Sequence, residues 1–281
     1  MPSEVKKEIN DISEIDWNEV IKKKKENKPE NHGEGSGYWN KRAPSFVNHV
    51  SKTLYPDSFL KIMNPRRSLT VLDMGCGGGT LAIPLAPKVK HITAVDFSEN
   101  MLERLRAEAD RRKIKNIKAV KASWQDDWEK AGIGIYDIAI ASRSLAVDDI
   151  QAALRKLINA ATKYVFISTV VGDGPFDRNI FNAIDREFNQ SVDYIYIYNL
   201  LYQMGIRANI HFIKEEKERK FKDRETASDS YIWMFQDLTA TEEKKLKIYL
   251  NEHLVKSGSK WMLDYKQRVR WAVIWWEIEK G

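Results

Sequence analysis

The sequence of 281 residues predicts an α/β fold, with a mostly parallel sheet and helices on both of its faces. Two observations lead to this prediction. From residue 69 onward, short apolar runs alternate with amphipathic helical patterns, which is typical of parallel strands buried on both faces. A glycine-rich turn follows the first run, at the place where open α/β sheets bind ligands.

Helix and strand signals set the expected order of elements. Ser98 can cap a helix after the second strand, and Asp148 and Asp149 suit the first turn of a later one. Thr239-Ala240-Thr241-Glu242 has the form of a capping box and predicts a helix through Leu254. Seven apolar runs are expected as strands: 69–74, 92–96, 116–121, 136–141, 164–170, 206–213 and 268–277.

The first 37 residues differ from the rest of the chain. Isoleucines at 9, 12, 15 and 21 predict a helix, and the polar segment 28–37, with its three glycines, predicts a flexible linker. We therefore expect an N-terminal extension over residues 1–37 and one domain over residues 38–281.

Charge and cysteine content limit the class of protein. The net charge is +6, from 46 basic and 40 acidic residues that are interspersed, which allows nucleic acid as a partner without requiring it. The single cysteine, Cys76, forms no intramolecular disulfide and indicates a reducing compartment. No apolar run approaches the roughly 20 residues of a membrane span. The expected location is the cytoplasm, with no membrane contact.

The glycine turn is the strongest functional signal. Asp73 ends the first strand, and four glycines follow within residues 75–79. Glycine lets the backbone turn sharply and approach a ligand closely, and the next helix offers unpaired N–H groups. Counted from Gly75, the dinucleotide fingerprint requires Gly or Ala where the chain has Thr80. The turn therefore predicts a nucleotide-type ligand other than a dinucleotide.

Asp96 ends the second strand, 19 residues after Gly77. A carboxylate there can accept hydrogen bonds from both hydroxyls of a ribose, as in dinucleotide sites. The alternative is that Asp96 only caps the helix that follows.

Asp73-Met74-Gly75-Cys76-Gly77 resembles motif I of the class I S-adenosylmethionine-dependent methyltransferases, which have a Rossmann-like fold. The resemblance implies that Asp73, Gly75, Cys76 and Gly77 surround the amino-acid part of S-adenosylmethionine. It also implies a seven-stranded sheet with one antiparallel strand, the seventh, inserted between strands five and six. Because about 50 residues separate the runs expected as strands six and seven, 206–213 and 268–277, residues 214–266 are expected as a cap insertion.

The segment from Asp96 to Leu102, with Phe97 and Met101 in it, is similar to a motif of small-molecule methyltransferases. The resemblance places Phe97 on the adenine and Met101 nearby. After the third strand, Ser123 takes the place of a family aspartate that binds the adenine amino group.

The chain offers other groups for the adenine contact. Asp126 or a backbone N–H would have to replace the family aspartate. Trp124 either stacks on the adenine or packs against the end of the strand.

Two further segments complete the expected site. Tyr38-Trp39-Asn40-Lys41-Arg42-Ala43 resembles an N-terminal segment that closes over the cofactor in related methyltransferases, so Tyr38 and Arg42 are assigned to the cofactor. Ser142 follows the fourth strand and is assigned to it as well. Arg143 either orients an anionic substrate or the cofactor carboxylate, or it pairs with Asp148 or Asp149.

These features together predict a methyltransferase that uses S-adenosylmethionine and releases S-adenosylhomocysteine, with a small-molecule acceptor. No catalytic base and no metal ligand is assigned. An RNA or protein acceptor is the alternative, favoured by the sequence pI of about 9.1 and the lysines at 22–25. A non-catalytic protein that binds S-adenosylmethionine is the third hypothesis.

Overall fold

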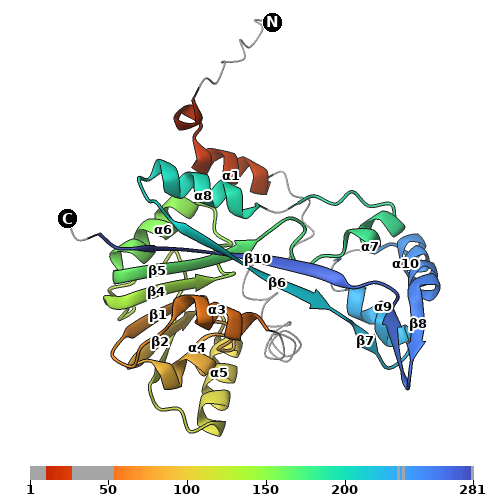
Figure 1. Ribbon diagram of the computed structural model, residues 1–281, viewed down its shortest axis with the longest axis horizontal. Helices are drawn as coiled ribbons and strands as arrows, with labels where there is room; N and C mark the ends of the chain where they lie inside the picture. The colour runs from red at the N-terminus through yellow and green to blue at the C-terminus, as the bar shows by residue number, and fades with distance from the viewer. Residues whose placement is uncertain (1–10, 27–53, 191, 233–234, 236–237, 280–281) are drawn as a thin grey trace, which may run out of the picture.

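The computed structural model describes residues 11–26, 54–190, 192–232, 235 and 238–279. A seven-stranded sheet in the order β3-β2-β1-β4-β5-β10-β6 forms its centre (Figure 1). β10 runs antiparallel to β5 and β6, and the other pairs are parallel. The predicted fold class is confirmed. The strands are β1 (Thr70–Met74), β2 (His91–Asp96), β3 (Ile117–Lys121), β4 (Tyr136–Ser142), β5 (Ala161–Val170), β6 (Asn209–Lys217) and β10 (Gln267–Glu277).

Helices cover both faces of this sheet because strand residues alternate between them. Val71 faces one apolar cluster and Leu72 faces the other. On the Val71 side, α5 buries Leu102 and Leu105, and Ser98 caps it by accepting the backbone N–H of Met101. The helices of this face are α3 (Tyr55–Met63), α4 (Ala82–Leu85) with the short η2 (Ala86–Lys88), and α5 (Glu99–Arg111).

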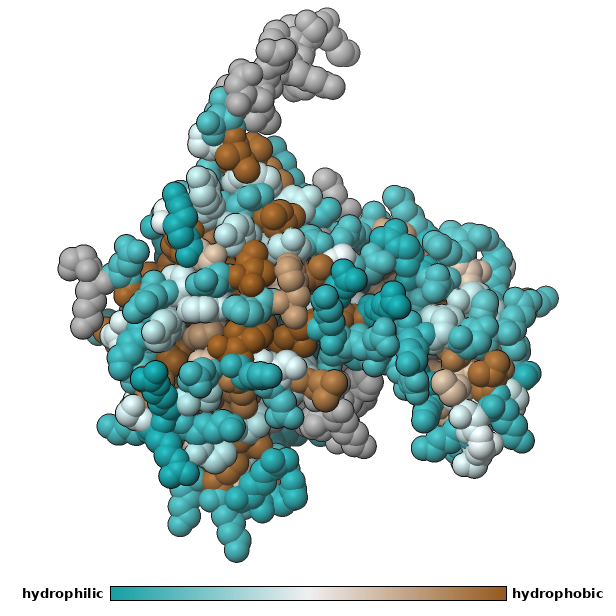
Figure 2. Space-filling model, in the orientation of Figure 1, coloured by the Kyte–Doolittle hydropathy of each residue, from teal (hydrophilic) through white to brown (hydrophobic). Residues whose placement is uncertain are grey.

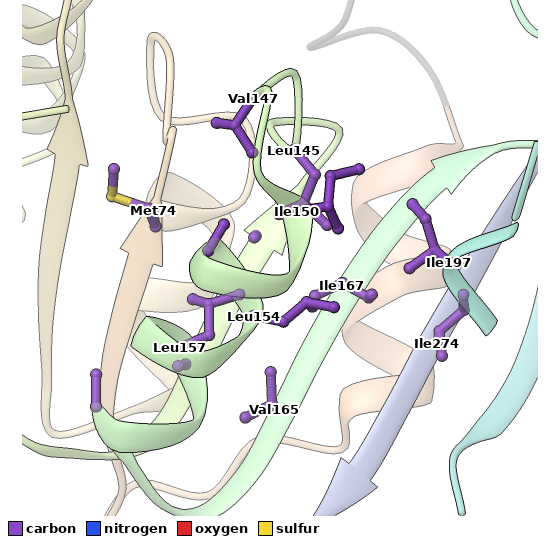
Figure 3. Close-up of a cluster of buried hydrophobic side chains, with 14 of the residues drawn as sticks. Met74, Leu145, Val147, Ile150, Leu154, Leu157, Val165, Ile167, Ile197 and Ile274 are labelled. Atoms are coloured by element: carbon purple, nitrogen blue, oxygen red, sulfur yellow. The ribbon is translucent and has the colours of Figure 1, made fainter. Parts of the chain in front are cut away.

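Figure 3 shows the other face, where Leu154 and Leu157 pack toward Val165 and Ile167. Asp149 is the N-cap of this helix, accepting the backbone N–H of Ala152 at 2.8 Å, so the expectation that it lies inside the first turn was wrong. The helices here are α1 (Trp17–Glu26), which follows η1 (Ile12–Glu14), α6 (Ile150–Asn159) and α8 (Tyr194–Gln203).

A smaller unit lies beyond the ends of β6 and β5 and the start of β10 (Figure 1). It has its own apolar cluster, in which Phe181 of α7 meets Leu246 and Leu250 of α10. The predicted capping box at Thr239 and Glu242 is confirmed. The elements are α7 (Arg178–Ala183), β7 (Lys220–Phe221), α9 (Arg224–Ile232), α10 (Ala240–His253), β8 (Leu254–Ser257) and β9 (Lys260–Leu263).

β6 differs from its expected range of 206–213, because it begins at Asn209 and continues through Lys217. The charged residues 214–217 therefore pair with β10 instead of starting the smaller unit. In the part of the chain that the structure describes, no helix is long and apolar enough to cross a membrane.

Candidate functional site

The glycine turn connects the end of β1 to α4 and is held by the end of β2. The backbone N–H groups of Gly75 and Cys76 both donate to the carbonyl oxygen of Val95, at 2.8 and 2.9 Å. Gly75, with φ of +73°, leaves no room for a side chain, because a Cβ would lie 2.3 Å from Cβ of Ser144. At Gly77, with φ of +54°, Sδ of Met101 at 4.0 Å is the one described atom within 4 Å of the corresponding Cβ position. The turn is closed on the Gly75 side and open at Gly77.

Asp96 joins this turn to the start of α5. One of its carboxylate oxygens accepts the backbone N–H of Gly77 at 2.8 Å, and the other accepts that of Ser98 at 2.9 Å. The side chain is buried, and burial raises its pKa although these backbone donors oppose the shift. Ser98, and not Asp96, is the N-cap of α5. The backbone N–H of Phe97 also acts on this carboxylate, and since a carboxylate has about four acceptor sites, Asp96 keeps capacity for a ligand hydroxyl.

Asp73 lies beside Asp96 and is only 1% exposed. One of its carboxylate oxygens has no hydrogen-bond partner among the described residues. Burial, together with the charge of Asp96, raises the pKa of Asp73 to about 7. Two neighbouring buried carboxylates, one with an unpaired oxygen, favour a cationic ligand group.

Cys76 and Phe97 complete the edge of the turn. Burial and the nearby aspartates raise the pKa of the Cys76 thiol well above its usual range, which favours the protonated thiol over the reactive thiolate. Phe97 is half-buried, next to Asp96.

The segment after β3 is held by its own hydrogen bonds. The carboxylate of Asp126 accepts the backbone N–H of Ser123 at 2.7 Å. Trp124 donates its indole N–H to the carbonyl oxygen of Ser144 at 3.0 Å and packs near Trp128. The geometry supports the packing interpretation of Trp124.

At the end of β4, Ser142 points toward α3 and not toward the glycine turn. Its hydroxyl bonds the hydroxyl of Tyr55 at 2.7 Å, and Ser168 of β5 bonds the same tyrosine at 2.5 Å. Ser144 turns the other way and donates to the carbonyl oxygen of Met74 at 2.7 Å. The hydroxyl next to the turn thus belongs to Ser144, which the sequence did not single out.

Arg143 lies between two aromatic rings. Its guanidinium carbon is 4.1 Å from the ring centre of Tyr55 and 5.0 Å from that of Trp271. It forms no ion pair with Asp148 or Asp149, so that alternative was wrong. Tyr38 and Arg42 lie outside the described residues.

Comparisons with known proteins bear on the family and the fold of the chain. Residues 71–163 match a family described as a methyltransferase domain. An uncharacterized protein of Haemophilus influenzae is 33% identical over 245 residues, which cover 86% of this chain and 89% of that protein. A ubiquinone biosynthesis O-methyltransferase of Rickettsia conorii is 30% identical over 102 residues, or 36% of this chain and 34% of that protein.

A solved structure of a proposed methyltransferase from Bacillus halodurans has the same fold. It aligns with a TM-score of 0.56 at 14% identity and covers 80% of this chain and 99% of that chain. With the strand order and the glycine turn, these matches define the class: the chain belongs to the class I S-adenosylmethionine-dependent methyltransferases. The methyl donor of that family is S-adenosylmethionine.

Proposed function

We propose that this protein transfers the methyl group of S-adenosylmethionine to a small-molecule acceptor. The observation that supports it most is the pair of buried carboxylates, Asp73 and Asp96, that face the glycine turn at the ends of adjacent strands. Asp96 would accept the ribose hydroxyls, and the unpaired oxygen of Asp73 would accept the ammonium group of the methionine part. The open space at Gly77 and the neighbouring Met101 suit the remainder of the nucleoside.

The work of the protein in this reaction is alignment. A bound sulfonium supplies an electrophilic methyl group, so no covalent intermediate with the protein is required. The chain has to hold the acceptor in line with the S–CH₃ bond and to exclude water, which is a proximity effect. A general base is needed only for an acceptor that is protonated at the working pH.

Calorimetry with S-adenosylhomocysteine and with NAD tests the donor assignment. The protein should bind the first and not the second. Asp96→Ala should weaken S-adenosylhomocysteine binding by about 2–3 kcal/mol, because hydrogen bonds to a charged group are lost. The matched control is Asp110→Ala, an exposed aspartate on α5, which should change nothing. Binding of NAD alone, or an unchanged affinity of Asp96→Ala, would contradict the assignment.

Turnover of labelled methyl donor in a cell extract tests the acceptor class. We expect the label in the low-mass fraction. Label in RNA, together with tRNA binding that falls steeply with salt, would favour the alternative acceptor, as would label in protein. No label in any fraction would leave a protein that binds the donor without turnover.

A further inference from the structure

Alternate residues of β6 form a charged row on the sheet face that α3 covers. Glu215 is buried at 6% exposure, Lys217 is half-buried, and Arg219 continues the alternation just past the strand. With Arg143 they form a group that we call the cationic cluster: Arg143, Lys217 and Arg219. Burial lowers the pKa of Lys217 most. The charge of Glu215 opposes this shift, and the charges of Arg219 and Arg143 add to it.

Arg143 is arranged to bind through the edge of its guanidinium. The rings of Tyr55 and Trp271 cover its flat faces, at 4.1 and 5.0 Å from the guanidinium carbon. Its Nε–H is buried and has no hydrogen-bond partner in the part of the chain that the structure describes. A guanidinium stacked in this way keeps its in-plane N–H donors for a carboxylate or phosphate, which it can bind bidentately.

Two other buried donors have no hydrogen-bond partner among the described residues. One is the indole N–H of Trp271, beside Arg143, and the other is the Nε–H of Arg219, whose guanidinium carbon lies 4.7 Å from the ring centre of Tyr231 in the smaller unit. A buried donor without a partner costs about 1–3 kcal/mol, so the two at Arg143 and Trp271, which lie in contact, call for a ligand rich in acceptor oxygens.

The carboxylates that face these groups do not neutralise them. They are Glu215, which acts on Arg143 and Lys217, and Asp177, which acts on Arg219. Asp177 is itself engaged, accepting the hydroxyl of Tyr265 at 2.8 Å. Three cations against two carboxylates leave the region positive.

The cluster and the two carboxylates assigned to the methyl donor, Asp73 and Asp96, lie at different strands along the same edge of the sheet. Trp271 belongs to β10, which is three strand spacings, or about 14 Å, from β1. Arg143 follows β4, which lies between β1 and β10 in the sheet, and its side chain contacts Trp271 of β10. Tyr55 is between the two sides, since both Arg143 and Asp73 act on its hydroxyl. Figure 2 shows a notch at the lower edge of the view, between the main body and the smaller unit.

We infer that Arg143, Lys217 and Arg219 bind an anionic group, a carboxylate or a phosphate, of the methyl acceptor. This inference rests on the proposed function, because the anionic group belongs to the methyl acceptor of that reaction. The acceptor atom would then lie between the cluster and the glycine turn.

Calorimetry on the full chain saturated with S-adenosylhomocysteine tests the inference. The probes are benzoate and phenyl phosphate, with benzamide as the neutral probe of similar shape. At least one anion should bind about tenfold or more tightly than benzamide, and the tighter anion identifies the preferred group. Binding of S-adenosylhomocysteine without either anion, or benzamide binding as tightly as both, would overturn the inference. Failure to bind S-adenosylhomocysteine would instead count against the proposed function.

Three variants locate the anion. Arg143→Met and Lys217→Met should each weaken the preferred anion about tenfold while the affinity for S-adenosylhomocysteine stays within about twofold. Lys214→Met is the matched control, because this exposed lysine lies on the opposite face of the same strand. If Arg143→Met unfolds the protein, Arg143→Lys keeps the charge, loses the bidentate geometry and should still weaken the anion. An unchanged anion affinity in these variants, or a loss confined to S-adenosylhomocysteine, would refute the assignment.

Discussion

The two sides of the carboxyl edge of the sheet carry opposite charge. At β1 and β2 the edge presents two buried carboxylates and a glycine turn. At β4, β10 and β6 it presents a guanidinium between aromatic rings, an ammonium group and N–H donors that have no partner among the described residues. A sulfonium donor with its ammonium group suits the first side, and an anionic acceptor suits the second. One sheet edge can thus order two ligands of opposite charge without a covalent intermediate.

The largest expected effect comes from closing the glycine turn. In Gly75→Ala, the new Cβ would lie 2.3 Å from the Cβ of Ser144 at a φ of +73°. Backbone strain and overpacking should together lower the free energy of unfolding by about 3 kcal/mol or more. Binding of S-adenosylhomocysteine should be lost, while the cationic cluster is untouched.

Gly172→Ala is the matched control for this change. It also has positive φ, +62°, but no atom lies within 4 Å of its Cβ position. It should cost about 1–2 kcal/mol from backbone strain alone. Urea unfolding of the two variants separates the effects, and equal costs would show that Ser144 does not close the turn.

The next effect is a pH dependence of S-adenosylhomocysteine binding. It arises at the end of β1 and β2, where Asp73 and Asp96 lie, which we call the acidic side. The pKa of Asp73 is about 7 in the free protein, so the carboxyl is protonated below that pH. An ammonium group binds the ionised form, so S-adenosylhomocysteine affinity should rise with pH up to about 7 and then level off. The slope below the pKa should approach about tenfold per pH unit.

Calorimetry between pH 5.5 and 8 measures this dependence, with proton release expected below pH 7. Asp73→Asn is the control, because it cannot titrate and should bind weakly at every pH. A wild-type affinity that does not change over this range would contradict the role of Asp73.

The smallest effect is expected at Tyr55, between the two sides. Tyr55→Phe removes the hydroxyl but leaves the hydroxyls of Ser142 and Ser168 bonded to each other at 3.3 Å. The free energy of unfolding should fall by about 1 kcal/mol, and S-adenosylhomocysteine affinity should stay the same. Tyr164→Phe, whose hydroxyl bonds no described residue, is the control. Thermal unfolding compares the stabilities of the two variants. Equal stabilities would show that the hydroxyl of Tyr55 does not stabilise the fold.

The acidic side could be predicted because its signals are local. Asp73, the glycines and Asp96 lie within two adjacent βα units, and the strand pairing of β1 with β2 brings them together. The cap at Ser98 and the capping box at Thr239 were predictable for the same reason. Glycine spacing alone does not exclude a dinucleotide, because Gly77, Gly79 and Ala82 fit the dinucleotide fingerprint, although the series counted from Gly75 does not.

The cationic side, at the ends of β4 and β6 and the start of β10, could not be predicted in this way. Tyr55, Arg143 and Trp271 are far apart in the chain, and only the insertion of β10 between β5 and β6 brings them into contact. The run from Lys214 to Arg224 has the composition of a solvated segment. Its register with β10 buries Glu215, and the alternation of a strand turns Lys217 to the same face. α3 was missed, although Pro56 and Asp57 in its first turn are typical of a helix start.

A crystal structure of the complex with S-adenosylhomocysteine and the preferred anionic probe tests the central claim most directly. We expect the ribose hydroxyls within hydrogen-bond distance of Asp96, the ammonium group at Asp73, and the anion on the guanidinium edge of Arg143. The claim would be contradicted by the carboxylate of S-adenosylhomocysteine on Arg143, or by the probe bound at the glycine turn.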